Sequence, residues 1–285
     1  MATQIFRKTS ADSISLWMGH KLHIIKWEPQ TPNCLLFISH GACEHMGRYN
    51  LLAEYLAAEG ILVFGHDHVG HGRSEGDRAH IEHYGQYVQD VIQTVEETKK
   101  QFPELPCYLM GHSMGGLIAG LTVVERQDLF KGLILSAALV EVDPNAAGWF
   151  IKTVSKVVAV LAPQLGIKKL NTDDISSVPE EVQAYVDDEL IYHGSCKAKW
   201  ATASLAAIAE LREQIKRIHL PLLLIHGIDD KIVPISGSEF IASNVSSPHL
   251  RFERFDGNRH EVFHDTEQTR AREVIKEWIF MSHKF

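Results

Sequence analysis

The segment Gly111-His112-Ser113-Met114-Gly115 carries the most specific chemical pattern in the chain. It follows the apolar run Tyr108-Leu109-Met110 and precedes a stretch with helical character. A serine on a sharp strand-to-helix turn, flanked two residues away by glycines, is exposed as a nucleophile. The first N–H groups of the following helix can stabilise a developing oxyanion. The pattern therefore predicts Ser113 as the nucleophile of an acyl-transfer reaction and disfavours a chance Gly-Ser turn.

Such a serine needs a base and a carboxylate that orients the base, and in this arrangement the chain order is Ser, then Asp or Glu, then His. The apolar run Leu222–His226 leads into a loop with two aspartates. We expect Asp230 to be the acid and Asp229 to cap a turn or face solvent. We expect His260, which follows the last predicted strand, to be the base. The alternative is His264, because the chain has 17 histidines and position alone separates the two.

A second loop, His40-Gly41-Ala42-Cys43, follows the early apolar run Leu35–Ser39. In this type of active site, the loop after an early strand donates one N–H of the oxyanion hole. We expect the backbone N–H groups of Ala42 and Met114 to form that hole, and His40 to make structural hydrogen bonds. An ordinary strand-to-helix turn is the alternative interpretation of the same residues.

The segment His66-Asp67-His68-Val69-Gly70-His71 contains three histidines that could suit zinc. It leaves a strand for a glycine-rich loop, where such side chains commonly bind backbone. A serine, histidine and aspartate set also leaves no chemical task for a metal. We therefore predict no metal site.

The elements that must position these residues alternate between strand and helix, which predicts one α/β domain with a mostly parallel central sheet flanked by helices. A hairpin is expected within Ser13–Glu28 at the edge of the sheet. The buried strands are expected at Leu35–Ser39, Ile61–Gly65, Cys107–Gly111, Leu133–Ser136, Leu222–His226 and Leu250–Phe255. The helices are expected at Tyr49–Glu59, Tyr84–Lys100, Gly115–Glu125 and Thr269–Ser282.

The alternation stops between about residues 140 and 218, where helical patterns such as Ala146–Leu161 and Lys199–Ile215 replace strands. We interpret this interruption as a helical cap inserted into a single domain spanning residues 1–285. The first of these helices is apolar around much of its circumference. It either packs on the sheet domain or inserts partly into lipid.

Composition narrows the function classes. The 285 residues are 45% hydrophobic and carry a formal net charge of -8, which disfavours a nucleic-acid partner. The four cysteines have no zinc-like spacing, and Cys34 and Cys107 are expected to be reduced core residues. No signal peptide or spanning segment is apparent. We expect a cytoplasmic protein, with peripheral membrane contact through the cap as an open possibility.

Taken together, these motifs resemble the monoglyceride lipase family of α/β-hydrolases. The blocks that carry the resemblance are His40-Gly41-Ala42, Glu44-His45 with Gly47-Arg48-Tyr49, Asp67-His68-Val69-Gly70-His71-Gly72 with Ser74-Glu75-Gly76, and Gly111-His112-Ser113-Met114-Gly115-Gly116. The chain departs from the family at Cys43, where glycine is usual. Since Cys43 adjoins the predicted oxyanion loop, a bulky thiol reagent is expected to block the site.

The resemblance implies the α/β-hydrolase fold and the hydrolysis of monoacylglycerols to fatty acid and glycerol at a membrane surface, without a cofactor. It also implies that Glu44, Arg48, Tyr185 and His264 lie near the glycerol end of the pocket. Glu44 and Arg48 are four residues apart, and a simple ion pair explains them equally well. A lysophospholipase or general carboxylesterase with the same triad is the alternative enzyme, and an inactive ligand-binding protein on this fold is the alternative class.

Overall fold

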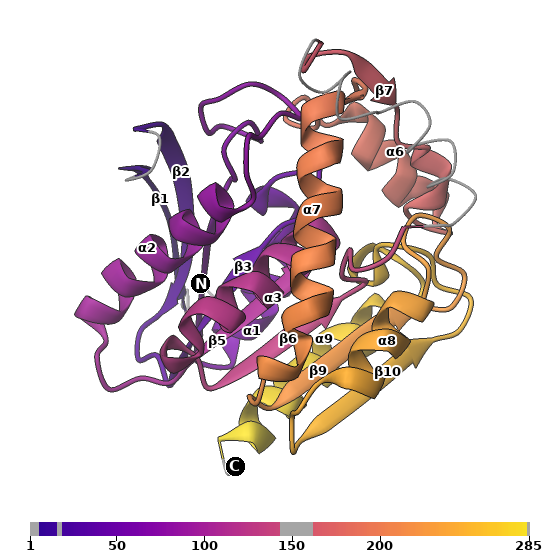
Figure 1. The fold of residues 1–285 in the computed structure, drawn as a ribbon. Coiled ribbons are helices and arrows are strands. Elements are labelled where there is room, and N and C mark those ends of the chain that lie inside the picture. The colour runs from indigo at the N-terminus through magenta and orange to yellow at the C-terminus, as the bar shows by residue number, and fades with distance from the viewer. Residues whose placement is uncertain (1–5, 16–18, 143–161, 284–285) are drawn as a thin grey trace.

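The computed structural model describes residues 6–15, 19–142 and 162–283 (Figure 1). The strands are β1 Phe6–Ile14, β2 Lys21–Pro29, β3 Cys34–Ser39, β4 Ile61–His66, β5 Cys107–His112, β6 Gly132–Ser136, β7 Gly166–Lys168, β8 Cys196–Lys197, β9 Leu222–Gly227 and β10 Leu250–Phe255. Eight of them form one sheet in the order β1-β2-β4-β3-β5-β6-β9-β10. β2 pairs antiparallel with β1 and β4, and the remaining neighbours are parallel.

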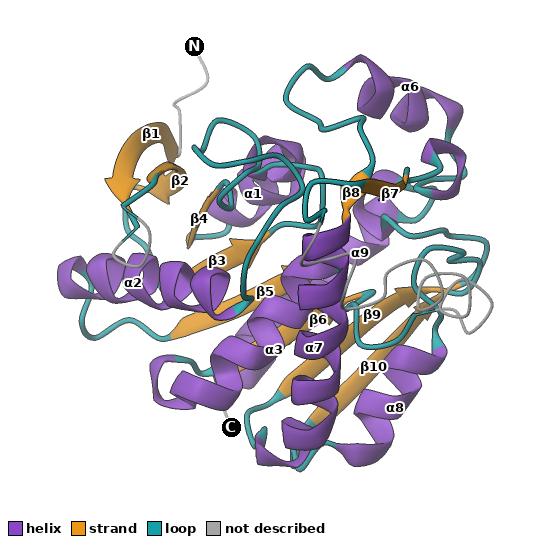
Figure 2. Ribbon diagram, turned by 45° about the horizontal axis from the view of Figure 1, so that its top comes forward, coloured by secondary structure: helices purple, strands orange, loops and turns teal. Residues whose placement is uncertain are grey.

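The helices of the described residues are α1 Asn50–Ala58, α2 Gly85–Gln101, α3 Met114–Arg126, α6 Pro179–Asp187, α7 Ala198–Gln214, α8 Ser236–Asn244 and α9 Gln268–Ser282. Figure 2 shows the sheet between two helical layers, with α2, α3, α7 and α8 over one face and α1 and α9 over the other. The predicted α/β fold with a mostly parallel sheet is confirmed.

Strand β3 shows how the sequence builds two cores from one strand. Leu35 and Phe37 pack in the core beneath α2, α3 and α7. Leu36 and Ile38 pack in the opposite core beneath α1 and α9. Successive side chains of a strand point to opposite faces, so a strand covered on both sides must be apolar throughout. The continuous apolar runs of the sequence are therefore the central strands.

The N-terminal hairpin is antiparallel, as expected, but the predicted start at Ser13 is too late because β1 begins at Phe6. β1 lies at the edge of the sheet, and most of its side chains are exposed. A strand without a buried face has no apolar alternation, so its sequence gives no strand signal.

The segment between β6 and β9 contains the small β7–β8 ladder, which was not predicted, and helices α6 and α7. The predicted helix Lys199–Ile215 corresponds to α7, which packs along α3. A Cβ atom on Gly120 of α3 would lie 2.7 Å from Leu211 Cδ2 of α7, so glycine permits this close approach. The predicted helix Ala146–Leu161 lies outside the described residues. No helix in the described part of the chain is long and apolar enough to cross a bilayer.

Candidate active site

Ser113 stands at the turn between β5 and α3, with φ 53° and ψ -118°. A side chain rarely adopts this backbone conformation, which costs of the order of 1–3 kcal/mol and persists only where its surroundings impose it. The turn brings Ser113 to the carboxyl edge of the sheet at the start of a helix.

The two flanking glycines are required by close packing and not by their own backbone angles. A Cβ atom on Gly111 would lie 2.2 Å from the carbonyl oxygen of Gly115. A Cβ atom on Gly115 would lie 2.0 Å from the carbonyl oxygen of Ser39, at the end of β3. The motif therefore lets the turn close on itself and on the neighbouring strand, and it brings the loop after β3 against the serine.

That loop contains Ala42, which lines the same cavity as Ser113. A Cβ atom on Gly41 would lie 3.4 Å from Ser113 Cβ, which shows how closely the loop approaches. Met114 is the first residue of α3, so its N–H has no acceptor within the helix. The structure thus places the loop that contains Ala42 close to the serine, and Met114 directly follows the serine at the start of α3.

Asp230 and His260 are hydrogen-bonded, with 2.7 Å between Asp230 Oδ2 and His260 Nδ1. The Asp230 side chain is completely buried. Its Oδ1 accepts from the N–H groups of Ile232 and Val233 at 2.8 and 3.0 Å. Asp229, by contrast, is exposed, as the sequence suggested. The carboxylate is therefore fixed by backbone donors in a position to orient the imidazole.

The environment of His260 favours its charged form. Burial alone would lower the pKa of His260, but the charge and hydrogen bond of Asp230, helped by Glu261 and Glu44, raise it above its ordinary value. Burial would raise the pKa of Asp230, yet His260 and His226 hold it well below its usual range. This is the pattern of a base whose protonated form is stabilised by a permanently ionised partner.

His226, which the sequence analysis did not single out, completes the surroundings of Asp230. Its Nε2 lies 3.2 Å from Asp230 Oδ2 and 3.0 Å from the carbonyl oxygen of Val233, and its Nδ1 lies 2.8 Å from Ser238 Oγ. His226 sits at the end of β9, four residues before the aspartate. That spacing was the signal available in the sequence.

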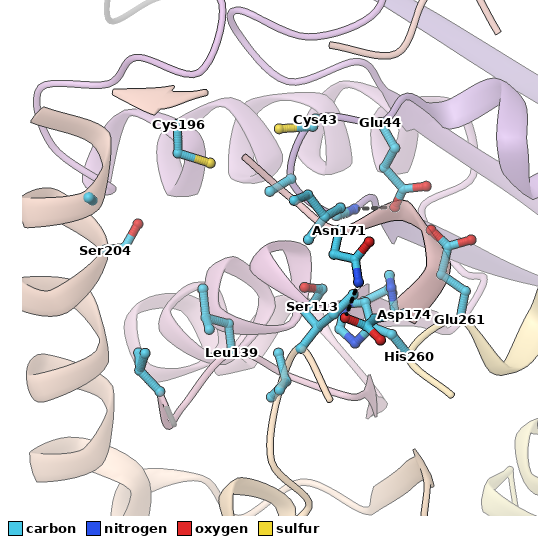
Figure 3. Close-up of a pocket in the computed structure, with 18 of the residues that line it drawn as sticks. Cys43, Glu44, Ser113, Leu139, Asn171, Asp174, Cys196, Ser204, His260 and Glu261 are labelled. Carbon is cyan, nitrogen blue, oxygen red and sulfur yellow. Dashed lines mark hydrogen bonds between the residues drawn. The ribbon is translucent and has the colours of Figure 1, made fainter. Parts of the chain in front are cut away.

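Ser113 and His260 lie beside each other in a cavity of about 230 Å³ (Figure 3). Much of its wall is apolar and comes from α7 and the loop after β6. The apolar residues lining it include Leu139, Val142, Leu170, Trp200, Ala201, Leu205, Ile208, Ile232 and Val233. Asn171 and Asp174, hydrogen-bonded to each other at 2.8 Å, line the same cavity as the serine and histidine and were not predicted. A long apolar group bound here would have its end next to the serine.

One end of the cavity is strongly polar. Arg48 donates to both carboxylate oxygens of Glu261 at 2.6 and 2.7 Å, and its Nη1 lies 3.5 Å from Glu44 Oε2. Glu44 also accepts hydrogen bonds from the backbone N–H of Gly41 and from the hydroxyl of Tyr49. The predicted Glu44–Arg48 pair exists, but the shorter bonds go to Glu261, which lies 213 residues from Arg48 and was missed.

The four residues that the family resemblance assigned to the glycerol end are close together. Glu44 and Tyr185 line the cavity. The Arg48 guanidinium lies 4.6 Å from the centre of the Tyr185 ring. His264 Nε2 donates to the Arg48 carbonyl at 2.9 Å, and its Nδ1 lies 3.1 Å from Glu261 Oε2. Arg48 and His264 therefore contact residues of the cavity wall.

The histidines of the 66–71 segment bind protein groups. His66 Nδ1 lies 3.0 Å from Thr94 Oγ1, His68 Nε2 lies 2.9 Å from Ser39 Oγ, and His71 Nδ1 donates to the Val69 carbonyl. His40 Nε2 accepts from the N–H of His68, as expected of a structural side chain. In the described ranges, no group of three or more His, Cys, Asp or Glu residues could hold a metal ion.

Comparison with known proteins agrees with this architecture. The profile of the family described as serine aminopeptidase, S33 (Hydrolase_4) matches residues 30–267. The chain is 36% identical to the monoglyceride lipase of Homo sapiens over 243 residues, which cover 85% of this chain and 80% of that protein. It is also 36% identical to the monoglyceride lipase homolog of Monkeypox virus over 258 residues, covering 89% of this chain and 92% of that protein.

Solved structures show the same fold. The crystal structure of the Paleococcus ferrophilus monoacylglycerol lipase matches with a TM-score of 0.83 at 27% identity, covering 92% of this chain and 99% of that one. A soluble variant of the Saccharomyces cerevisiae monoglyceride lipase, in complex with a substrate analog, matches with a TM-score of 0.84 at 20% identity. It covers 99% of this chain and 96% of that one.

Proposed function

The chain belongs to the monoglyceride lipase family of α/β-hydrolases, and from that premise we propose that it hydrolyses monoacylglycerols to free fatty acid and glycerol, with Ser113, Asp230 and His260 as its catalytic triad. It is a carboxylic ester hydrolase by family. The observation that carries the proposed triad is the hydrogen bond between the buried Asp230 and His260, beside Ser113 in a largely apolar cavity.

In the first half of the reaction, His260 takes the Ser113 proton as the serine oxygen attacks the ester carbonyl. Asp230 holds the imidazole in the required tautomer and stabilises its positive charge. The backbone N–H groups of Ala42 and Met114 bind the oxyanion of the tetrahedral intermediate. Loss of one such donor costs about 10²–10³ in rate in serine hydrolases.

In the second half, His260 returns its proton to the glycerol leaving group, and an acyl-enzyme remains on Ser113. Water then attacks the acyl carbonyl while His260 again acts as the base, and the fatty acid leaves. The chemistry needs no cofactor. The apolar wall from α7 accommodates the acyl chain throughout both halves.

We assign the glycerol hydroxyls to the polar end of the cavity, where Glu44 and Tyr185 face the bound molecule. Arg48 and His264 position the residues of this end. Arg48 packs on the Tyr185 ring and pairs with Glu261, and His264 donates a hydrogen bond to the Arg48 carbonyl. A head group with hydrogen-bond donors suits this end, because the Glu44 carboxylate accepts hydrogen bonds and the charged groups around it have a net negative charge.

Two measurements test the assignment. Ser113→Ala should abolish both labelling by a fluorophosphonate probe and ester turnover, whereas labelling of the variant would place the nucleophile elsewhere. A panel of mono-, di- and triacylglycerols and a lysophospholipid should show preference for monoacylglycerol. Faster turnover of lysophosphatidylcholine would identify a lysophospholipase instead, and the buried carboxylates of the polar end disfavour the phosphate of that zwitterionic head group.

We further propose that residues 140–218 form a cap over the active site and that its apolar segment at 146–161 contacts membranes peripherally. Support for the cap comes from α6, α7 and Asn171, which belong to this region and contribute residues that line the cavity. The membrane contact rests on the sequence of the segment, which lies outside the described residues. Flotation with liposomes tests it, since Trp149→Ala with Phe150→Ala should weaken binding.

A further inference from the structure

One hydroxyl group lies in the part of the cavity wall that α7 forms, where the neighbouring side chains are mostly apolar. The α7 residues that line the cavity are Trp200, Ala201, Ser204, Leu205 and Ile208. Trp200, Ser204 and Ile208 follow one another at a spacing of four, so Ser204 stands midway along this face of the helix. Figure 3 shows Ser204 on the opposite side of the cavity from His260 and Glu261. This hydroxyl is therefore separate from the polar end of the cavity.

The Ser204 hydroxyl has two partners in the protein. It donates its proton to the carbonyl oxygen of Trp200, one helical turn earlier, at 2.8 Å. The buried Tyr84 hydroxyl lies 2.8 Å from Ser204 Oγ, and Tyr84 is the donor because the Ser204 proton is already used. A hydroxyl oxygen has one proton and two lone pairs. The groups of the described structure use the proton and one lone pair, so the second lone pair can accept from a bound molecule.

Stability alone does not account for this pair of hydroxyls. Replacement of both partners of a buried hydrogen bond by apolar groups of the same shape can be nearly neutral. Tyr84→Phe with Ser204→Ala would make this wall as apolar as its surroundings. An unsubstituted acyl chain against Ser204 would also leave the second lone pair desolvated without a hydrogen bond, which is unfavourable. A chain that carries a hydrogen-bond donor fits this position better.

We propose that Ser204 is a specificity-determining residue, and that the enzyme prefers monoacylglycerols whose acyl chain carries a hydroxyl group partway along its length. The hydroxyl of the chain donates to Ser204 Oγ. This assignment rests on the proposed function, which places the ester carbonyl at Ser113 and the acyl chain along α7. A ketone has lone pairs but no proton, so it cannot form this hydrogen bond while Ser204 donates to Trp200. The preferred substituent is an alcohol.

The quantity that reports this contact is a ratio of two kcat/KM values, one for a hydroxylated ester and one for its unsubstituted counterpart. Loss of the Ser204 hydroxyl leaves the chain hydroxyl buried without its acceptor, which should lower the ratio by about tenfold. The unsubstituted chain has no hydrogen bond to lose. If Ser204 had only a structural role, its removal would change both values together and leave the ratio unaltered.

The experiment compares ricinoleoylglycerol with oleoylglycerol, which differ by one hydroxyl, and extends to hydroxystearoylglycerols that carry the hydroxyl at successive carbons. At least one hydroxylated ester should exceed its unsubstituted counterpart by about threefold to tenfold in kcat/KM. Ser204→Ala should abolish that preference, and the ketone at the same carbon should show none in the parent enzyme. Equal values for every isomer, an unchanged ratio in Ser204→Ala, or a ketone preferred as strongly as the alcohol would overturn the proposal.

Two control variants separate this contact from effects on folding. Tyr84→Phe removes a hydrogen bond of Ser204 but keeps its hydroxyl in the cavity wall, so the preference should remain. Thr202→Ala deletes another hydroxyl of α7, which donates to the Ala198 carbonyl at 2.9 Å and, in the described structure, lies outside the cavity wall. Its ratio should equal that of the parent. A loss of preference in Thr202→Ala as large as in Ser204→Ala would contradict the assignment.

The methyl esters of ricinoleic and oleic acid distinguish a failure of this proposal from a failure of the proposed function. Good turnover of the methyl esters with poor turnover of monoacylglycerols would reject the proposed function, while the ratio of the two methyl esters would still test Ser204. Good turnover of monoacylglycerols with a ratio that Ser204→Ala leaves unchanged would support the proposed function and reject the role of Ser204.

Discussion

Asp230 and Glu261 are both buried carboxylates near His260, but their charges are compensated in different ways. Asp230 is held by two backbone N–H groups and two histidines. Glu261 is held by the guanidinium of Arg48 through two short hydrogen bonds and by His264. Burial opposes ionisation in both, yet the partners keep the pKa of each carboxyl well below its usual range.

The difference is whether the compensating charge can change during a reaction. Arg48 is always protonated, so the Glu261 pair has one charge state and can only position its neighbours. His260 can gain and lose a proton, and its attraction to the Asp230 carboxylate becomes stronger when it is protonated. Removal of Asp230 should therefore affect rate more than stability, whereas disruption of the Arg48–Glu261 pair should affect stability more than rate.

The largest expected effect is that of Asp230→Asn. It removes the charge that stabilises protonated His260 and disturbs the imidazole tautomer, so kcat should fall by about 10⁴-fold, as in other serine triads. Steady-state kinetics on a monoacylglycerol ester measures this change. The matched control is the exposed Asp229→Asn, which should retain nearly full activity. A larger loss in the control than in Asp230→Asn would reverse the assignment of the acid.

The two carboxylates also differ in how far the sequence predicted them. Asp230 follows an apolar strand at a recognisable spacing, and Ser113 and His260 stand in the expected chain order, so local patterns and connectivity suffice to propose all three. The Arg48–Glu261 pair depends on two loops that meet only after the sheet has formed. No pattern in the local sequence predicts such a long-range contact. The same limit hid β1, whose exposed residues carry no apolar alternation.

The second prediction tests the Glu261 side of the comparison. Arg48→Met leaves Glu261 and Glu44 buried without their cation, so the free energy of unfolding should fall by about 3–5 kcal/mol. Urea denaturation measures this change. The double variant Arg48→Met with Glu261→Leu should recover a large part of the loss, because no carboxylate of that pair remains uncompensated. A double variant as unstable as Arg48→Met would show that the arginine stabilises the fold by packing on Tyr185 instead.

The third prediction separates the carboxylates by their effects on His260. The base must be neutral to accept the serine proton, and its pKa is raised, so kcat/KM should fall as the pH drops through a value above 6.5. In Asp230→Asn, burial dominates and the midpoint of this acid limb should move down by about 1 to 3 pH units. Glu261→Gln should move it in the same direction by less. Equal shifts in the two variants would mean that Glu261 is as strongly coupled to the base as Asp230.

The prediction with the smallest expected effect tests whether backbone strain at Ser113 lowers the stability of the protein, in addition to the free-energy cost of burying charges at the active site. Ser113 has φ 53°, where glycine is free of the strain that alanine suffers. Both Ser113→Gly and Ser113→Ala lack the nucleophile, but the glycine variant should be the more stable by about 1 kcal/mol in urea denaturation. At Ala203, inside α7, the preference should invert, with Ala203→Gly losing about 1 kcal/mol. If alanine were the more stable residue at both positions, the turn at Ser113 would be relaxed, and the cost of this active site would lie in its buried charges alone.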